Sequence, residues 1–154
     1  MQVFTIYRTQ KLPVPLSQAW EFFSDPHNLK DITPVDLGLQ IKTAPKEKMY
    51  DGMIITYRVS LIMNFSMTWV MEIKNIHPPH SFIDEQRFGP YRFWHHRHTF
   101  RDVPGGVEIG DWIHYALPFG IFSPMINDAV VAPKLEKIFN HCARTLAYKF
   151  GTLA

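Results

Sequence analysis

The chain has 154 residues, of which 46% are apolar and 19% are charged, and these values are typical of one globular domain with a sizeable core. Its formal net charge of +2 comes from 16 basic and 14 acidic residues spread along the sequence, so a nucleic-acid-binding protein is not expected. Cys142 is the only cysteine, which excludes an internal disulfide and a thiolate metal cluster within one chain.

The sequence does not indicate a membrane-spanning or export segment. No stretch approaches the roughly 20 apolar residues that a spanning helix needs, and the N-terminal residues lack the charged-then-apolar order of a signal peptide. We therefore expect a single domain over residues 1–154 that lies in the cytoplasm, makes no stable membrane insertion and is a monomer or a homodimer.

The first third of the chain predicts one strand and two short helices. Apolar and polar residues alternate from residue 3 to residue 10, as they do in a half-buried strand. The period becomes helical in "PLSQAWEFFSDP", where Ser17 is the expected N-cap and Trp20 and Phe23 face inward. The dipeptide Asp25-Pro26 ends this helix and is expected to begin a second short one.

From residue 37 to residue 117 the pattern is that of consecutive strands. β-Branched and aromatic residues alternate with polar ones between turn-forming pairs such as Asp51-Gly52 and Gly89-Pro90. We predict antiparallel strands, in meander order, near residues 37–44, 53–63, 66–76, 81–88, 91–101 and 107–117.

A long amphipathic helix follows the strands. Beyond Pro118 and Gly120, apolar residues recur at helical spacing as far as Phe150, and Pro133 either begins this helix or kinks it. A curved sheet with one apolar face needs a cover, and this helix is the only predicted element long enough to provide it. The predicted fold class is therefore α+β, with a curved antiparallel sheet wrapped around the C-terminal helix.

The strand at 81–88 carries polar residues on the face that we expect to point inward. This face consists of Phe82, Asp84, Gln86 and Phe88, because the alternate set is the more polar. An unpaired buried polar group costs roughly 1–3 kcal/mol. Asp84 and Gln86 therefore need hydrogen-bond partners nearby.

The stretch "GPYRFWHHRHTF" offers such partners on the next strand. Trp94 and Phe100 bracket His96 and His98 on one face, and we assign this face inward. A two-residue turn at Gly89-Pro90 would place the histidines opposite the outer residues of strand 81–88. The assignment therefore requires a bulge or a three-residue loop.

The following hairpin has the same ambiguity. Its turn around Pro104 allows either Asp111 and Tyr115 or Trp112 and His114 to lie beside the histidines. We favour Asp111 and Tyr115, because a carboxylate next to an imidazole satisfies both groups.

Three interpretations of the histidine pair are open. Two imidazoles and a carboxylate from a neighbouring strand can bind a metal ion; His96 or His98 can act as a general base that Asp84 or Asp111 orients; or the residues form a hydrogen-bond network that is structural or orients a ligand. We favour the network and expect neither a metal nor a cofactor. The sequence has no nucleophile elbow, phosphate-binding glycine loop or dinucleotide fingerprint that would indicate a particular reaction.

The order of these motifs along the chain resembles that of the START-like, or SRPBCC, superfamily. This superfamily includes the birch-pollen-allergen proteins, lipid-transfer START domains and aromatase/cyclases. The resemblance is strongest to a branch of small stand-alone bacterial proteins. The matching positions are Tyr57, Trp69, Ile73, Pro78-Pro79, Phe82, Asp84, Gln86, Gly89-Pro90-Tyr91, Trp94, His96, His98, Phe100, Gly105-Gly106, Asp111, Ile113, Tyr115, Pro118 and Gly120. One departure is His141-Cys142, which replaces a Tyr-Arg pair expected on the last helix, so the charge partner that this Arg would give Asp111 is missing.

The resemblance implies a helix-grip fold with a cavity for a hydrophobic ligand between the sheet and the long helix. It implies no particular chemistry, because the superfamily includes carriers, sensors and cyclases.

Our leading hypothesis is a carrier or sensor that binds a small hydrophobic molecule of lipid, polyketide or aromatic type. The expected walls are Tyr57, Leu61, Trp69, Met71, Phe82, Trp94, Phe139 and Leu146, and the expected polar end is Asp84, Gln86, His96, His98 and Tyr115. The alternatives are a filled core without a ligand and a cyclase or dehydratase that uses His96 or His98 as general base.

Overall fold

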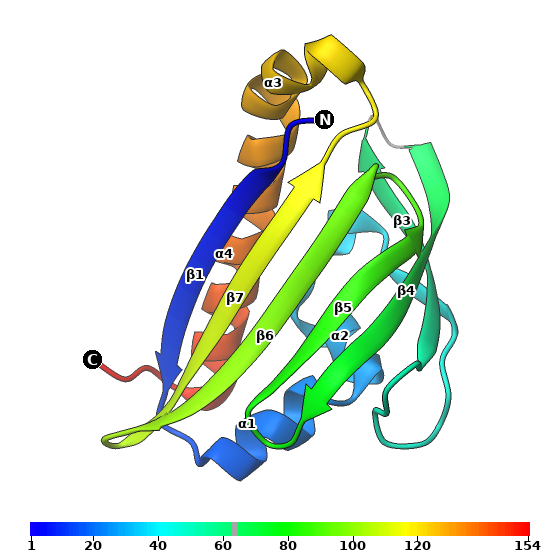
Figure 1. Cartoon of the computed structure of the whole chain (residues 1–154). Helices are drawn as coiled ribbons and strands as arrows, with labels where there is room; N and C mark the ends of the chain where they lie inside the picture. The colour runs from blue at the N-terminus through cyan, green and yellow to red at the C-terminus, as the bar shows by residue number, and fades with distance from the viewer. Residues whose placement is uncertain (63–64) are drawn as a thin grey trace.

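The computed structural model describes residues 1–62 and 65–154, without the side chains of residues 61 and 62. In this part of the chain, seven strands form one sheet in the order β1-β7-β6-β5-β4-β3-β2 (Figure 1). The strands are β1 (Phe4–Leu12), β2 (Gln40–Thr43), β3 (Ile54–Ile62), β4 (Phe65–His77), β5 (Ser81–Phe88), β6 (Phe93–Val103) and β7 (Gly106–Ala116). All neighbours are antiparallel and β2 to β7 pair in chain order, so the predicted meander is confirmed.

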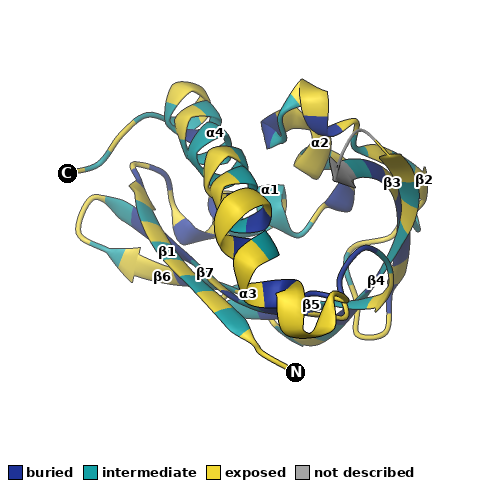
Figure 2. Ribbon diagram, turned by 90° about the horizontal axis from the view of Figure 1, so that it is seen from above, coloured by how far each residue is buried: buried dark blue, intermediate teal, exposed yellow. Residues whose placement is uncertain are grey.

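The helices cover one face of this curved sheet (Figure 2). The short elements α1 (Leu16–Phe23), η1 (Pro26–Asn28), α2 (Leu29–Ile32) and η2 (Val35–Leu37) follow β1. After β7 come η3 (Gly120–Phe122), α3 (Ser123–Ile126) and the π-helical turn η4 (Asn127–Val131), which lead into the long helix α4 (Ala132–Phe150). This is the expected α+β helix-grip arrangement.

Helix α4 packs through an apolar stripe. Leu135 and Leu146 are buried against the sheet side, and Lys149 and Arg144 are exposed. Pro133 lies in the first turn of α4, directly after the π-helical turn η4, so of the two predicted roles it takes the one at the start of the helix. None of the helices in the described residues combines the length and apolarity needed to cross a bilayer.

Two sequence-based boundaries are wrong. Helix α1 begins at Leu16 after Pro15, and no side chain caps it, so Ser17 lies inside the first turn and is not the N-cap. Strand β2 is shorter than the predicted strand at 37–44, because η2 extends to Leu37 and its C-cap, Gly38, has a left-handed φ of 61°, which delays the extended backbone.

The inward assignment of Phe88 is also wrong, since this side chain is 61% exposed. Val70 pairs with Phe88, whereas the next residue, Met71, pairs with Gln86. Arg87 is therefore an extra residue in β5, and this bulge reverses the direction of the side chain that follows it.

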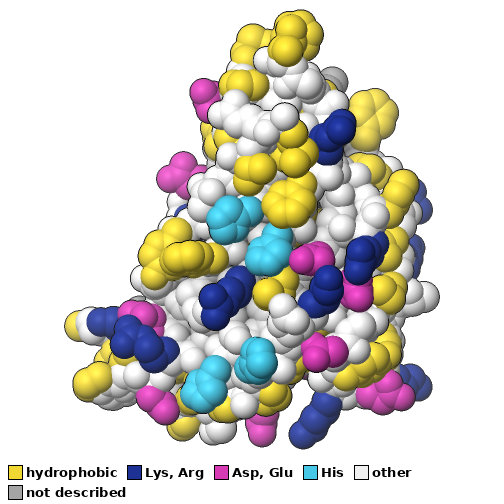
Figure 3. All heavy atoms as spheres, viewed as in Figure 1, with side chains coloured by type: hydrophobic (Ala, Val, Ile, Leu, Met, Phe, Trp, Pro, Cys, Tyr) yellow, Lys and Arg dark blue, Asp and Glu magenta, His cyan; other side chains and the backbone are white. Residues whose placement is uncertain are grey.

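The outer face of the sheet carries a mixture of side chains. Figure 3 shows basic, acidic, histidine and apolar groups interspersed over the strands. His95 and His114 pair across β6 and β7 on this face. Charges of both signs are mixed on this face (Figure 3), in line with the near-neutral net charge of the chain.

Candidate ligand-binding site

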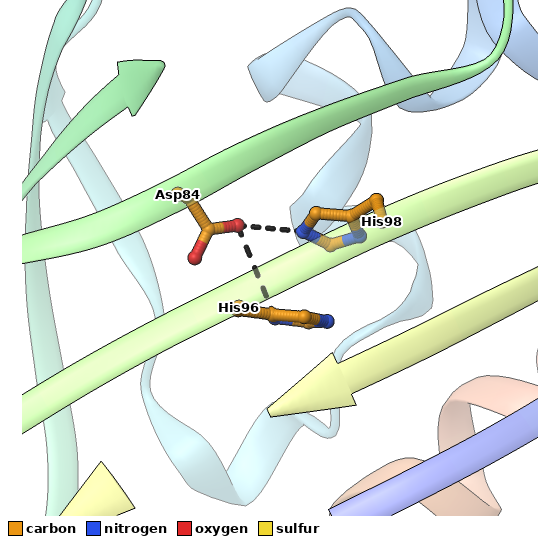
Figure 4. Close-up of side chains that lie close together, drawn as sticks. All are labelled: Asp84, His96 and His98. Atoms are coloured by element: carbon orange, nitrogen blue, oxygen red, sulfur yellow. Dashed lines mark hydrogen bonds and ion pairs between the residues drawn. The ribbon is translucent and has the colours of Figure 1, made fainter. Parts of the chain in front are cut away.

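The inner face of the sheet brings two histidines and two aspartates together. Asp84 on β5 lies opposite His96 on β6, and His98 lies opposite Asp111 on β7. A four-residue loop, 89–92, joins β5 to β6. This connection is longer than the two-residue turn that would have placed the histidines outside, and the register pairs His96 with Asp84 and His98 with Phe82, so the inward assignment is confirmed. We call Asp84, His96, His98 and Asp111 the Asp–His cluster; Figure 4 shows three of its members.

Each imidazole is hydrogen-bonded to the carboxylate that lies diagonally across from it. His98 Nε2 is 2.6 Å from Asp84 Oδ2, and His96 Nε2 is 2.7 Å from Asp111 Oδ1. The other ring nitrogens approach the same oxygens less closely: His98 Nδ1 is 3.4 Å from Asp111 Oδ1, and His96 Nδ1 is 3.9 Å from Asp84 Oδ2. One oxygen of each carboxylate therefore faces both rings, and the cluster is a closed cycle of alternating acid and imidazole.

Aromatic packing fixes the planes of the two rings. His98 is stacked between Phe82, at a centroid distance of 4.3 Å, and His96, at 3.8 Å. Phe139 of α4 meets the His96 ring edge-on at 6.1 Å. Trp94 Nε1 donates to Asp84 Oδ1 at 3.3 Å. Packing and hydrogen bonds together restrain rotation of these side chains, so the cluster is preorganised.

The carboxylates keep His98 protonated at neutral pH. Burial alone lowers the pKa of this imidazole, but the charges and hydrogen bonds of Asp84 and Asp111 outweigh burial and raise the pKa to about 9. Burial opposes ionisation of both carboxyl groups, yet their contacts with His96 and His98 hold the pKa of each below its ordinary value. At neutral pH the cluster therefore contains two carboxylates and at least one imidazolium.

A cavity of about 180 Å³ lies beside the cluster, between the sheet and the helices. Strands β3 to β6 form one wall, the segment 22–39 forms a second, and α4 forms a third. The lining is mostly apolar. His96, His98 and Asp84 supply polar atoms to it, so the cavity has a polar end and a large apolar remainder.

Most of the expected ligand-binding residues border this cavity. They are Tyr57, Trp69, Met71, Phe82, Asp84, Trp94, His96, His98 and Phe139. Leu146 is buried but lies on a different part of α4 and does not border it. The side chain of Leu61 lies outside the described residues.

The structure places Gln86 and Tyr115 away from the polar end. The Gln86 amide bonds to both the N–H and the carbonyl of Tyr91, so it braces the loop between β5 and β6. The Tyr115 hydroxyl donates to Asn127 Oδ1 at 2.6 Å and ties β7 to the start of the final helical region. Both side chains are hydrogen-bonded to other groups of the protein, and neither borders the cavity.

The donor set fits a hydrogen-bond network better than a metal site. Asp84, His96 and His98 each offer one ligand atom within 4.8 Å of the others, a spacing that a metal ion can bridge. However, the short contacts of these atoms already pair each imidazole with a carboxylate. A metal would also have to displace the proton that the carboxylates stabilise on His98.

Comparisons with known proteins bear on the fold. No protein-family model and no curated protein matches the sequence. A START superfamily protein from Mycobacterium smegmatis superposes with a TM-score of 0.70 at 10% identity, over 95% of this chain and 96% of that chain. Ara h 8.0201 superposes with a TM-score of 0.61 at 12% identity, over 96% of this chain and 99% of that one.

A third similar structure is BexL, a di-domain ARO/CYC protein of the BE-7585A biosynthetic pathway. Its TM-score is 0.65 at 14% identity, over 95% of this chain and 48% of that chain. This chain has the START-like fold. At such low identities the likeness shows the fold alone, and the chemistry has to be argued from the site.

The sequence alone does not show that residues 22–39 form part of the cavity wall. Leu29 and Ile32 have helical spacing, and Leu37 and Leu39 alternate, but each run is too short for its period to fix which side faces inward. Cys142 also borders the cavity. Its spacing of three residues from Phe139 on the helix identifies it, because such residues share a face.

Arg8 is a further inner-face residue that the sequence patterns do not single out. It is the cross-strand partner of Asp111 in the β1–β7 register. Its guanidinium donates to Asn140 Oδ1 on α4 and lies 6.0 Å from the centre of the Phe139 ring. A cation from β1 therefore lies under α4, the helix on which the START-like resemblance implied that an arginine is missing.

Proposed function

We propose that the protein binds a small hydrophobic molecule in this cavity, with the polar group of the ligand beside the Asp–His cluster, and that it acts as a carrier or a sensor. The observation that carries the proposal is a buried, preorganised polar cluster at one end of a mostly apolar cavity. Ligand sites commonly have this composition, with many apolar groups for affinity and a few polar groups for orientation.

The cavity argues against a completely filled core. Its volume of about 180 Å³ exceeds the roughly 150 Å³ of an engineered apolar cavity that stays dry and binds benzene. A dry cavity of this size costs stability, because its lining atoms lose packing contacts. An apolar ligand would restore those contacts, which supports a binding role.

A blocking substitution tests the proposal. Cys142 borders the cavity, whereas Arg144 is exposed on the same helix. Cys142→Phe should therefore fill part of the cavity and Arg144→Phe should not. Isothermal titration of the full chain with para-propylphenol should show binding to the wild type and to Arg144→Phe, and at least a tenfold loss with Cys142→Phe. Equal binding by all three proteins would place the probe outside the cavity and contradict the proposal, and a wild type that binds neither this probe nor the other hydrophobic probes named below would refute it.

A second candidate function is acid–base catalysis of dehydration, and the paired aspartates favour it. His98 already carries its proton at neutral pH, so its expected role as general base is replaced by that of general acid. It would protonate a leaving hydroxyl, while His96, oriented by Asp111 at 2.7 Å, would accept the α-proton. A β-hydroxy ketone would thereby lose water and form an enone.

Absorbance of the enone tests this candidate with a single-ring β-hydroxy ketone as substrate. Catalysis that is lost in His98→Gln and retained in His95→Gln would support it. If the enone forms no faster with the protein than without it, the catalytic candidate is refuted and ligand binding remains the proposed function.

A further inference from the structure

The cavity is small for a lipid or a polycyclic compound. Its volume is about 180 Å³, whereas pockets for drug-sized molecules are roughly 300–1,000 Å³. A cavity of roughly 150 Å³ accommodates one benzene molecule. The available space therefore matches a single ring with a short substituent, and it is too small for a long acyl chain or several fused rings.

The charges around the cavity are unfavourable for an anion. Among the described residues, Asp25 and Asp84 border the cavity, and neither a lysine nor an arginine does. The basic groups nearest to the polar end are the two imidazoles, and each is hydrogen-bonded to a carboxylate. Asp111 adds another negative charge behind His96. Arg8 does not border the cavity, since its guanidinium donates to Asn140.

The remaining polar groups of the lining are uncharged. Burial and the nearby Asp84 raise the pKa of Tyr57 above its usual value, so its hydroxyl stays protonated. Burial and Asp111 raise the pKa of Cys142 to about 12, so its thiol stays neutral. A ligand hydroxyl or carbonyl can exchange hydrogen bonds with such groups. A ligand carboxylate would lose its hydration without gaining an unpaired cation.

We infer that the cavity selects compact, single-ring molecules with an uncharged hydroxyl or carbonyl group, and that it excludes carboxylates and long acyl chains. This inference rests on the proposed function, because it names the ligand class of the same cavity. Fatty acids are therefore not its ligands, although they are hydrophobic and carry one polar group.

Four probes test the inference on the full chain at pH 7 by isothermal titration. Propylbenzene, para-propylphenol and para-propylbenzoate share one skeleton and differ in the polar group, while palmitate tests length. We expect para-propylphenol to bind at least tenfold more tightly than para-propylbenzoate and more tightly than propylbenzene, and we expect no binding of palmitate. Palmitate or para-propylbenzoate binding within threefold of the phenol, and weakened by Cys142→Phe, would overturn the inference and leave the proposed function intact. Failure of all four probes would overturn both.

A charge-neutralising variant tests the electrostatic part. Asp84→Asn keeps the side-chain shape and removes one negative charge from the lining, so it should improve para-propylbenzoate binding relative to para-propylphenol by at least fivefold. Glu85→Gln removes the same charge from the adjacent residue, which pairs with Lys74 at 3.2 Å away from the cavity, and it should leave the ratio unchanged. Asp111→Asn is a second test of the same kind. An unchanged ratio in both aspartate variants would show that charge does not select the ligand.

Discussion

Replacement of Asp84 by alanine should destabilise the protein far more than the same change at the next residue. Asp84 accepts hydrogen bonds from His98 Nε2 at 2.6 Å and from Trp94 Nε1 at 3.3 Å. Its loss leaves an imidazolium and an indole N–H without their acceptor in a buried site. Removing one partner of a buried ion pair costs about 3–5 kcal/mol, and the lost bond to the indole adds to that cost.

Glu85→Ala is the matched control for this prediction. Glu85 pairs with Lys74 at 3.2 Å, and the Lys74 side chain is 37% exposed. Solvent-exposed pairs contribute about 1 kcal/mol or less. The two adjacent alanine variants should therefore differ by several kcal/mol because one side chain faces the cluster and the other faces solvent.

Urea unfolding at pH 6, followed by tryptophan fluorescence, measures both free energies of unfolding. We expect a loss of about 3–5 kcal/mol for Asp84→Ala and about 1 kcal/mol or less for Glu85→Ala. Losses of equal size would refute the reasoning, because they would mean that the Asp–His cluster contributes no more than a surface ion pair.

Four further predictions concern pH, binding, the helix cover and metal. The pKa of His98 is raised to about 9 from an ordinary 6.5, so protonated His98 stabilises the fold fully below pH 6.5, and this contribution disappears as the pH rises through 9. The free energy of unfolding should therefore fall more over this range in the wild type than in His98→Gln. Equal losses would contradict the raised pKa. His98→Ala should weaken para-propylphenol binding by about 1–3 kcal/mol and His95→Ala should not; loss with both would point to a general destabilisation. Leu146→Asp should cost several kcal/mol by urea unfolding and the exposed Lys149→Asp little, whereas similar costs would mean that α4 does not pack through this stripe. Elemental analysis of tag-free protein should show no stoichiometric zinc, iron or copper, and chelator should leave the Tm unchanged; one tightly held metal ion per chain would contradict the hydrogen-bond network.

The sequence was most informative where a local pattern and a chemical need agreed. The alternation in strand 91–101 placed His96 and His98 on one face, and the large aromatic residues Trp94 and Phe100 that bracket them selected that face as the inner one. The structure confirms this placement, because β5 and β6 pair Asp84 with His96. Local periodicity was sufficient here because β6 pairs with both of its neighbours without a register shift.

The errors arose where tertiary contacts decide the outcome. The bulge at Arg87 turns Phe88 outward, and no residue in that run indicates an inserted position. Tyr115 faces inward as predicted, but Asn127, which is distant from the predicted strands, takes its hydroxyl away from the cluster. Alternation predicts the face on which a side chain lies, but it does not predict which of several possible partners that side chain will bond.

Position-specific contacts between protein and ligand test the central claim most directly. Filtered NOE spectra of para-propylphenol bound to the isotope-labelled full chain report which side chains touch each end of the probe. A ligand in the cavity predicts contacts from the propyl group to Met71 and Ile138, which border the apolar part, and from the ring beside the hydroxyl to the His98 imidazole. Contacts with exposed apolar residues such as Phe122, in the absence of any contact with Met71 or His98, would contradict the claim.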